Sequence, residues 1–164
     1  MSDLIETNLV SKYFLILALI NTIAAICFTL PILLPTSGLP LIIGAFPGTW
    51  LIVGYFVFLI VGVIGMLGWS IVYSSMPSMF DKHQTSKRLS IIHLVFSELA
   101  IYGVASTISF IGWQGGQALR QGLSIASVGF FPDAYVLATG VFVAPVLLGQ
   151  LIGVLNIFST IRMK

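Results

Sequence analysis

Four long runs of apolar residues carry almost no charge, and they restrict this chain to very few folds. The runs cover about residues 13–34, 48–74, 89–112 and 134–160. A membrane-spanning helix needs about 20 mostly apolar residues, and each run reaches that length. Because lipid offers the backbone no hydrogen-bond partners, such a run must form a helix. The sequence therefore predicts an all-α polytopic membrane protein with four transmembrane helices in a single domain, residues 1–164.

The composition agrees with this prediction. Apolar residues make up 58% of the chain and charged residues 7%, whereas about a quarter of the residues in a typical soluble domain are charged. The net charge of +2 comes from residues near the ends of the runs. It therefore reflects membrane topology and predicts no nucleic-acid partner.

The basic residues indicate how the helices are oriented. All but one lie at the two chain ends or between the second and third runs, and the exception, Arg120, lies between the third and fourth. The other six are Lys12, Lys82, Lys87, Arg88, Arg162 and Lys164. Lysine and arginine are enriched on the cytoplasmic side of membranes, and an even number of spans leaves both termini on one side. We therefore expect an N-in, C-in topology in the cell membrane.

The residues that most often bind redox metals are scarce. Cys27 is the only cysteine, so an internal disulfide and a cluster of thiolate ligands are both excluded. We expect it to be a small buried apolar side chain. His83 and His93 are the only histidines. A copper site with three histidine ligands therefore cannot be built from this chain.

Small and amide-bearing residues indicate how the helices pack. Gly149 and Gly153 form a GxxxG pattern in the fourth run, which allows a neighbouring backbone to approach closely. We expect them to pack within the chain, with dimerisation as the alternative. The amides of Asn21, Gln150 and Asn156 should face protein, because an unpaired polar group in lipid is costly. Four helices are few for satisfying these amides, which hints at partner subunits.

Glu98 places a carboxyl group near the middle of the third run. We expect it to be neutral and hydrogen-bonded, locking a contact between helices or subunits; a proton relay or a metal ligand is the alternative. Tyr102 lies one helical turn further along, shares the face of Glu98 and could hydrogen-bond to it. His93 lies about 140° around the helix from Glu98. We expect His93 to be an interface histidine and not a ligand.

Several short motifs occur in the order found in a known family. Gly48 to Phe58 read GTWLIVGYFVF, Met76 to Phe80 read MPSMF, Ser90 to His93 read SIIH, and Asn156 to Phe158 read NIF. They resemble subunit I of the heme–copper oxidases, whose corresponding patterns are D/N-T-x-x-V-x-H-F-H, F-P-K-M-F, G-K-I-H and N-I-F. The resemblance covers residues 48–164, about the last three helices of a twelve-helix subunit, and agrees with the expected membrane sides.

The departures from the family pattern bear on the chemistry. The family's first matched helix carries two axial heme histidines, and those positions are Tyr55 and Val57 here. Valine has no donor atom, so the family's heme ligation is lost. The family also carries arginines that bind heme propionates near the position of Arg120. The resemblance therefore leaves Tyr55, His93 and Arg120 as heme candidates, and it implies no catalytic residue and no metal site.

These observations lead to one principal functional hypothesis. The chain is expected to be a non-catalytic integral membrane subunit of a respiratory or other redox complex, most closely a terminal-oxidase-like assembly. It would stabilise a catalytic subunit by helix packing, with lipids and other integral membrane subunits as partners. It would carry no cofactor and would not be an enzyme on its own. The alternatives are a heme-binding electron-transfer subunit and, from general architecture alone, an accessory subunit of a membrane copper monooxygenase.

Overall fold

A computed structural model describes residues 2–34, 38–44, 46–81, 86–124 and 133–162. Within these ranges all regular structure is helical, and four helices are long and apolar enough to cross a membrane. The predicted all-α fold with four spanning helices is therefore confirmed. Three residues on which sequence predictions rest lie outside the described ranges: Lys82, His83 and Lys164.

The helices follow one another along the chain, with the longest connection between Arg120 and Asp133. Their bounds are α1, Ser2–Leu33; α2, Leu39–Ile43; α3, Trp50–Val57; η2, Phe58–Gly65; α4, Met66–Phe80; α5, Lys87–Arg120; and α7, Asp133–Arg162. The segments α3, η2 and α4 form one continuous helix whose middle turns are π-helical. This continuous helix provides the second span.

Local sequence sets where two of these helices begin and end. Ser86 caps α5, since its side chain accepts a hydrogen bond from the backbone N–H of Leu89 at 3.3 Å. Asp81 ends α4 in the left-handed conformation, with φ of 51°. Proline is unfavourable inside a helix, yet Pro77 lies within α4. Helix α4 thus continues beyond residue 74, the predicted end of the second run.

The third span is longer than its hydropathy predicts. Helix α5 continues past the predicted end at residue 112 and reaches Arg120, through the buried glycines Gly115 and Gly116. A Cβ atom at Gly116 would lie 2.7 Å from the carbonyl oxygen of Ile42, so α2 packs directly on this part of α5. Tertiary packing here overrides the low helix propensity of glycine.

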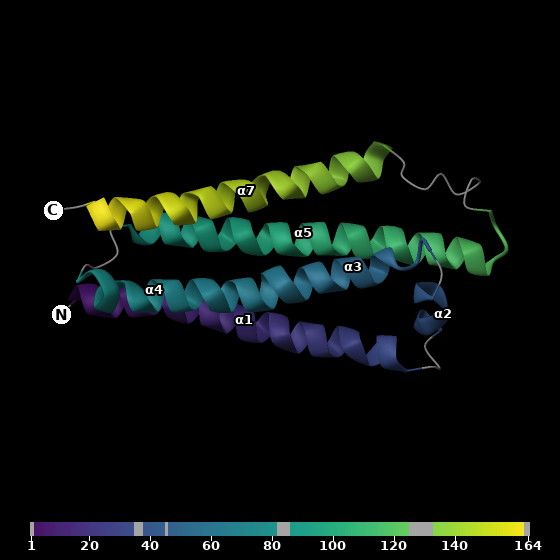
Figure 1. Cartoon of the computed structure of the whole chain (residues 1–164), viewed down its shortest axis with the longest axis horizontal. Coiled ribbons are helices and arrows are strands. Elements are labelled where there is room, and N and C mark those ends of the chain that lie inside the picture. Colours follow the sequence, from purple (N-terminus) through teal and green to yellow (C-terminus); the bar gives the residue numbers. More distant parts are fainter. Residues whose placement is uncertain (1, 35–37, 45, 82–85, 125–132, 163–164) are drawn as a thin grey trace.

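The spanning helices lie side by side in a row (Figure 1). Helix α1 packs against η2 and α4, the second span packs against α5, and α5 packs against α7. Helices α1 and α7 lie at opposite ends of this helix row, without an extensive contact between them. The start of α1 and the end of α7 lie on the same side of the helix row, at the left-hand tips of the helices in Figure 1. Which side faces the cytoplasm stays a prediction.

The main apolar core lies where α1, α4 and α5 meet. It consists of Val10, Phe14, Ala18, Met66, Tyr73 and Ile101. On α1 the buried residues recur every three or four positions, which forms a single stripe facing the second span. Cys27 falls outside this stripe and is exposed. The prediction that it is buried is therefore wrong, because α1 has protein on one side only.

The second span and α5 approach each other closely at two glycines. A Cβ atom at Gly54 would lie 2.7 Å from the carbonyl oxygen of Ala105. A Cβ atom at Gly112 would lie 2.6 Å from the carbonyl carbon of Trp50 and 2.9 Å from the Cα of Leu51. These distances are shorter than a side chain tolerates. Glycine at these positions therefore sets how near α3 can come to α5.

Candidate functional site

One polar cluster lies within the spans and joins α1, η2 and α5. Its central residue is Asn21, which is fully buried. The Nδ2 atom of Asn21 donates to the carbonyl oxygen of Gly62 at 2.9 Å and to Oε2 of Glu98 at 3.3 Å. Its Oδ1 atom accepts a hydrogen bond from the hydroxyl group of Tyr102 at 2.9 Å. A single amide thus connects three helical segments, and we call these four residues the Asn21 cluster.

Asn21, Glu98 and Tyr102 were expected from the sequence to have polar partners, but their pairing differs from the prediction. Glu98 is hydrogen-bonded, as expected, and its partner is Asn21. The Tyr102 hydroxyl bonds to Asn21 instead of to Glu98. A Cβ atom at Gly62 would lie 3.4 Å from Nδ2 of Asn21, so a glycine leaves room for this amide. The pairing depends on how α1 docks on α5, which residue spacing within one helix cannot reveal.

A second polar cluster surrounds His93 at the start of α5. His93 is fully buried, and its Nδ1 atom lies 3.1 Å from the hydroxyl oxygen of Tyr73. Its ring stands edge-on to Trp69, with ring centroids 4.3 Å apart, and lies 5.2 Å from the ring of Phe14. On the opposite side, a Cβ atom at Gly153 would lie 2.6 Å from Cε1 of His93. His93 therefore packs inside the chain, and the expectation of an interface histidine is wrong.

The remaining amides in the spans find partners within the chain. Asn156 is fully buried and donates from Nδ2 to the hydroxyl oxygen of Ser90 at 2.8 Å. Gln150 donates from Nε2 to the hydroxyl oxygen of Ser97 at 3.1 Å and accepts from Nε1 of Trp69 at 2.9 Å. These bonds connect α7 to α4 and α5. Each amide thus has a partner within the described part of the chain, but Oδ1 of Asn156 is buried without one, so the expectation that four helices are few for these amides is contradicted only in part.

The GxxxG pattern of α7 faces α5 of the same chain. A Cβ atom at Gly149 would lie 3.2 Å from the Cβ of Phe96, and Gly153 lies against His93. Both glycines are buried. Intramolecular packing thus occupies this pattern, which leaves it unavailable as a dimerisation surface.

The three heme candidates lie apart. Tyr55 on α3 hydrogen-bonds to Thr29 on α1, and its ring stacks on the ring of Phe28, also on α1. His93 and Arg120 lie near opposite ends of α5, and 27 residues of helix at 1.5 Å each separate them by about 40 Å. Arg120 lies over the backbone of Gly38, where a Cβ atom would be 3.0 Å from Nη1 of the arginine. The fold does not bring these side chains to a common site.

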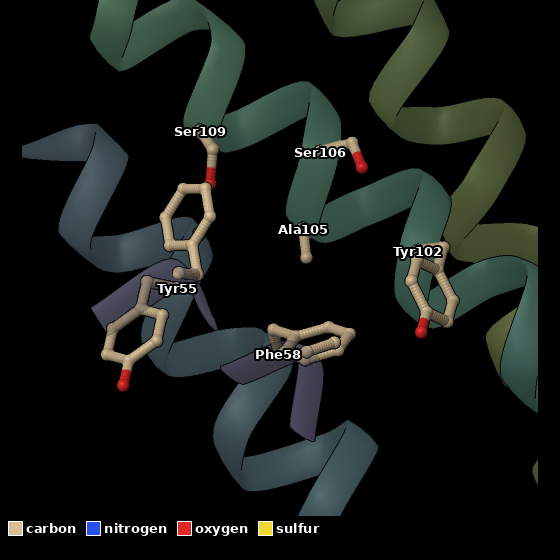
Figure 2. Close-up of a pocket in the computed structure, with 9 residues that line it drawn as sticks. Tyr55, Phe58, Tyr102, Ala105, Ser106 and Ser109 are labelled. Atoms are coloured by element: carbon tan, nitrogen blue, oxygen red, sulfur yellow. The ribbon is translucent and has the colours of Figure 1, made fainter. Parts of the chain in front are cut away.

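A groove of about 180 Å³ opens between α1, α3, η2 and α5. Figure 2 shows the rings of Tyr55 and Phe58 on the second span and the side chains of Tyr102, Ala105 and Ser106 on α5 around this space. Pockets for small molecules usually measure about 300–1,000 Å³, so this groove is small for a cofactor. The groove could not be predicted from the sequence, because residues from α1, the second span and α5 form it together.

Within the described ranges, no group of three or more histidine, cysteine, aspartate or glutamate side chains could hold a metal ion. Comparison with known proteins finds no matching family model, no matching curated protein and no matching solved structure. The resemblance to subunit I of the heme–copper oxidases thus rests on its sequence motifs alone. The fold and its polar contacts define an all-α, multi-pass membrane protein whose intramembrane polar side chains connect its own helices.

Replacing Tyr73 with phenylalanine tests the His93 cluster. The change removes only the hydroxyl group that lies 3.1 Å from Nδ1 of His93. We expect the free energy of unfolding to fall by about 1 kcal/mol, since the histidine loses a buried hydrogen bond. Unfolding by dodecyl sulfate in mixed micelles, followed by circular dichroism, measures the change. Tyr13→Phe is the control because Tyr13 is exposed on α1. Equal stability of both variants would contradict this role for Tyr73.

Proposed function

We propose that this chain is a non-catalytic integral membrane subunit of a larger redox complex, in the cell membrane and with both termini in the cytoplasm. Its role is to pack its helices against a catalytic subunit and to shape the lipid-facing rim of the complex. The resemblance of residues 48–164 to a terminal-oxidase subunit is the reason for naming a respiratory or redox complex. The arrangement of basic residues supports the proposed orientation.

The open helix row is the observation that carries this proposal. The four spans lie side by side, with α1 and α7 at opposite ends, so the row presents two broad faces. Many large apolar side chains are exposed on these helices, including Leu33, Ile64, Leu99 and Leu137. Such a surface suits lipid and neighbouring helices equally well. Helices arranged in this way can line a larger subunit.

The hydrogen bonds that polar side chains make between helices support the same proposal. Asn21, Gln150 and Asn156 bond to side chains or backbone of neighbouring helices. Tyr55, at one of the family's heme-ligand positions, hydrogen-bonds to Thr29 of α1. These residues hold the helix row together. This arrangement favours a structural role over electron transfer by this chain.

Purification under mild conditions tests the proposal. The full-length chain, tagged and solubilised from its own membranes in digitonin, is expected to migrate on a native gel in a complex with a redox-active subunit. Mass spectrometry identifies the partners in that band. The purified single chain is expected to show no Soret absorption band. A chain that migrates alone at all detergent concentrations would contradict the subunit proposal, and a stoichiometric heme in the single chain would favour the electron-transfer alternative.

A further inference from the structure

We propose that the face of α5 bearing Glu98 and Tyr102 is the docking surface for a transmembrane helix of another subunit, which places a lysine or arginine side chain beside the Glu98 carboxylate. This inference rests on the proposed function and adds the chemistry of the partner. It follows from the unfilled bonding capacity of Glu98, from the positions of the basic residues and from the groove on the same face.

The Glu98 side chain accepts few of the hydrogen bonds that a carboxylate can accept. Its side chain is half-buried, and among the described residues its one hydrogen bond is the contact of 3.3 Å from Asn21 to Oε2. A carboxylate can accept about four hydrogen bonds. The neighbouring donors are already engaged, because Asn21 also binds the carbonyl oxygen of Gly62 and the Tyr102 hydroxyl donates to Asn21. Glu98 can therefore accept further hydrogen bonds from a donor outside the chain.

Among the residues that the structure describes, no cation lies close enough to Glu98 to serve as that donor. Lys87 and Arg88 are the nearest basic residues on α5, and they precede Glu98 by eleven and ten residues, about 15 Å or more of helix. Arg120 follows Glu98 by 22 residues, about 33 Å. The other basic residues lie toward the chain ends or between the second and third spans. Intramembrane acids usually pair with a base or face a protein interior. Charge complementarity therefore points to a basic side chain on a partner.

The groove continues the same surface along α5. Tyr102, Ser106 and Ser109 follow Glu98 at intervals of four, eight and eleven residues, which places them on one side of the helix. Tyr102 borders both the Asn21 cluster and the groove (Figure 2). The acid and the far end of the groove are about 16 Å apart along the helix. One continuous surface thus combines a carboxylate with an aromatic-lined hollow.

The size of the groove favours a helix over a free ligand. Its 180 Å³ lies below the usual range of about 300–1,000 Å³ for small-molecule pockets. A single large apolar side chain from a neighbouring helix fits such a hollow, as a knob fits a hole in packed helices. Val95 and Leu99 are 45% and 65% exposed beside Glu98, so apolar surface for a second helix borders the acid. A partner helix that carries a basic residue and, about two turns away, a large apolar residue could place the first beside Glu98 and the second in the groove.

Co-purification of variants tests this docking surface. Glu98→Gln removes the charge while keeping the size of the side chain, and Ser106→Phe places a bulky side chain at an exposed position that lines the groove. Each is expected to reduce the recovered partner about tenfold, because a desolvated charge or a central apolar contact is lost. Leu147→Ala is the control, since Leu147 is 65% exposed on α7, away from this face. Circular dichroism and dodecyl-sulfate unfolding of each single chain verify that the fold is retained.

Charge reversal adds a second measurement. Glu98→Lys is expected to abolish the complex, and replacing the partner's basic residue with glutamate is expected to restore it. If the wild-type chain recovers its partner and the Glu98 and Ser106 variants recover equal amounts, the docking surface is overturned while the proposed function stands. If the wild type recovers no partner, the proposed function itself fails. Glu98-dependent binding of tetraphenylphosphonium by the single chain, with an intact complex in Glu98→Gln, would identify a ligand site and overturn the inference.

Discussion

Replacing Gly112 with alanine is expected to force α3 away from α5 and to lower the free energy of unfolding by about 2 kcal/mol. The new Cβ atom would lie 2.6 Å from the carbonyl carbon of Trp50 and 2.9 Å from the Cα of Leu51. These are backbone atoms, so no side-chain rotation can relieve the overlap. Overpacking a close contact typically costs about 1–3 kcal/mol. The better helix propensity of alanine, about 1 kcal/mol, offsets only part of this cost.

Gly68→Ala is the matched control for this change. Gly68 likewise lies inside a membrane-spanning helix, α4 of the second span, but a Cβ atom there would meet nothing within 4 Å. The free energy of unfolding of the Gly68→Ala variant is expected to stay the same or to rise by up to about 1 kcal/mol. Unfolding of both variants by dodecyl sulfate in mixed micelles measures the difference. Equal midpoints for Gly112→Ala and Gly68→Ala would show that α3 and α5 do not touch as described.

Asn21→Leu is expected to destabilise the helix row by about 2–4 kcal/mol. Leucine has a similar volume but cannot make the three hydrogen bonds to Gly62, Glu98 and Tyr102. Hydrogen bonds within membranes contribute about 0.6 kcal/mol each on average and up to about 1.7. The Glu98 carboxyl and the Gly62 carbonyl would also lose their donor in a buried setting, which adds to the penalty. The same unfolding assay measures the change.

Thr22→Val provides the comparison for Asn21→Leu. The Thr22 hydroxyl bonds at 2.8 Å to the carbonyl oxygen of Ala18 in its own helix, so it joins no two helices. Its loss is expected to change the free energy of unfolding by less than about 0.5 kcal/mol. A double variant with Glu98→Gln is expected to be less destabilised than the sum of the two single changes, because the residues share one bond. Strict additivity would mean that Asn21 and Glu98 act independently.

Several features of the fold could be predicted from the sequence because they depend on local composition. Long apolar runs require helices in lipid, so the four spans and the all-α class followed directly. The helix ends were harder to predict. The third apolar run ends at residue 112, but the packing of α2 on α5 keeps Gly115 and Gly116 helical. The second run ends at residue 74, but α4 continues through Pro77 to Phe80.

For the polar residues, too, only part of the structure could be predicted from the sequence. Their need for partners was predictable, because an unpaired amide or acid is costly in lipid. Their actual partners were not predictable, since Asn21 lies 77 positions before Glu98 and the contact depends on the docking of α1. Cys27 and His93 were both placed wrongly for a related reason. Which side of a uniformly apolar helix faces protein is not evident from hydropathy when lipid and protein interiors are equally apolar.

The amino-acid sequence by itself determined that this chain forms four apolar membrane helices and that its few polar side chains must be satisfied. Only the tertiary structure decided the order of the helices in the row, the junction of α1, η2 and α5 at Asn21, and the groove beside it. The physical reason is that helix formation in lipid follows from backbone hydrogen bonding within one segment. Helix association depends on close packing and on single hydrogen bonds between residues far apart in the chain.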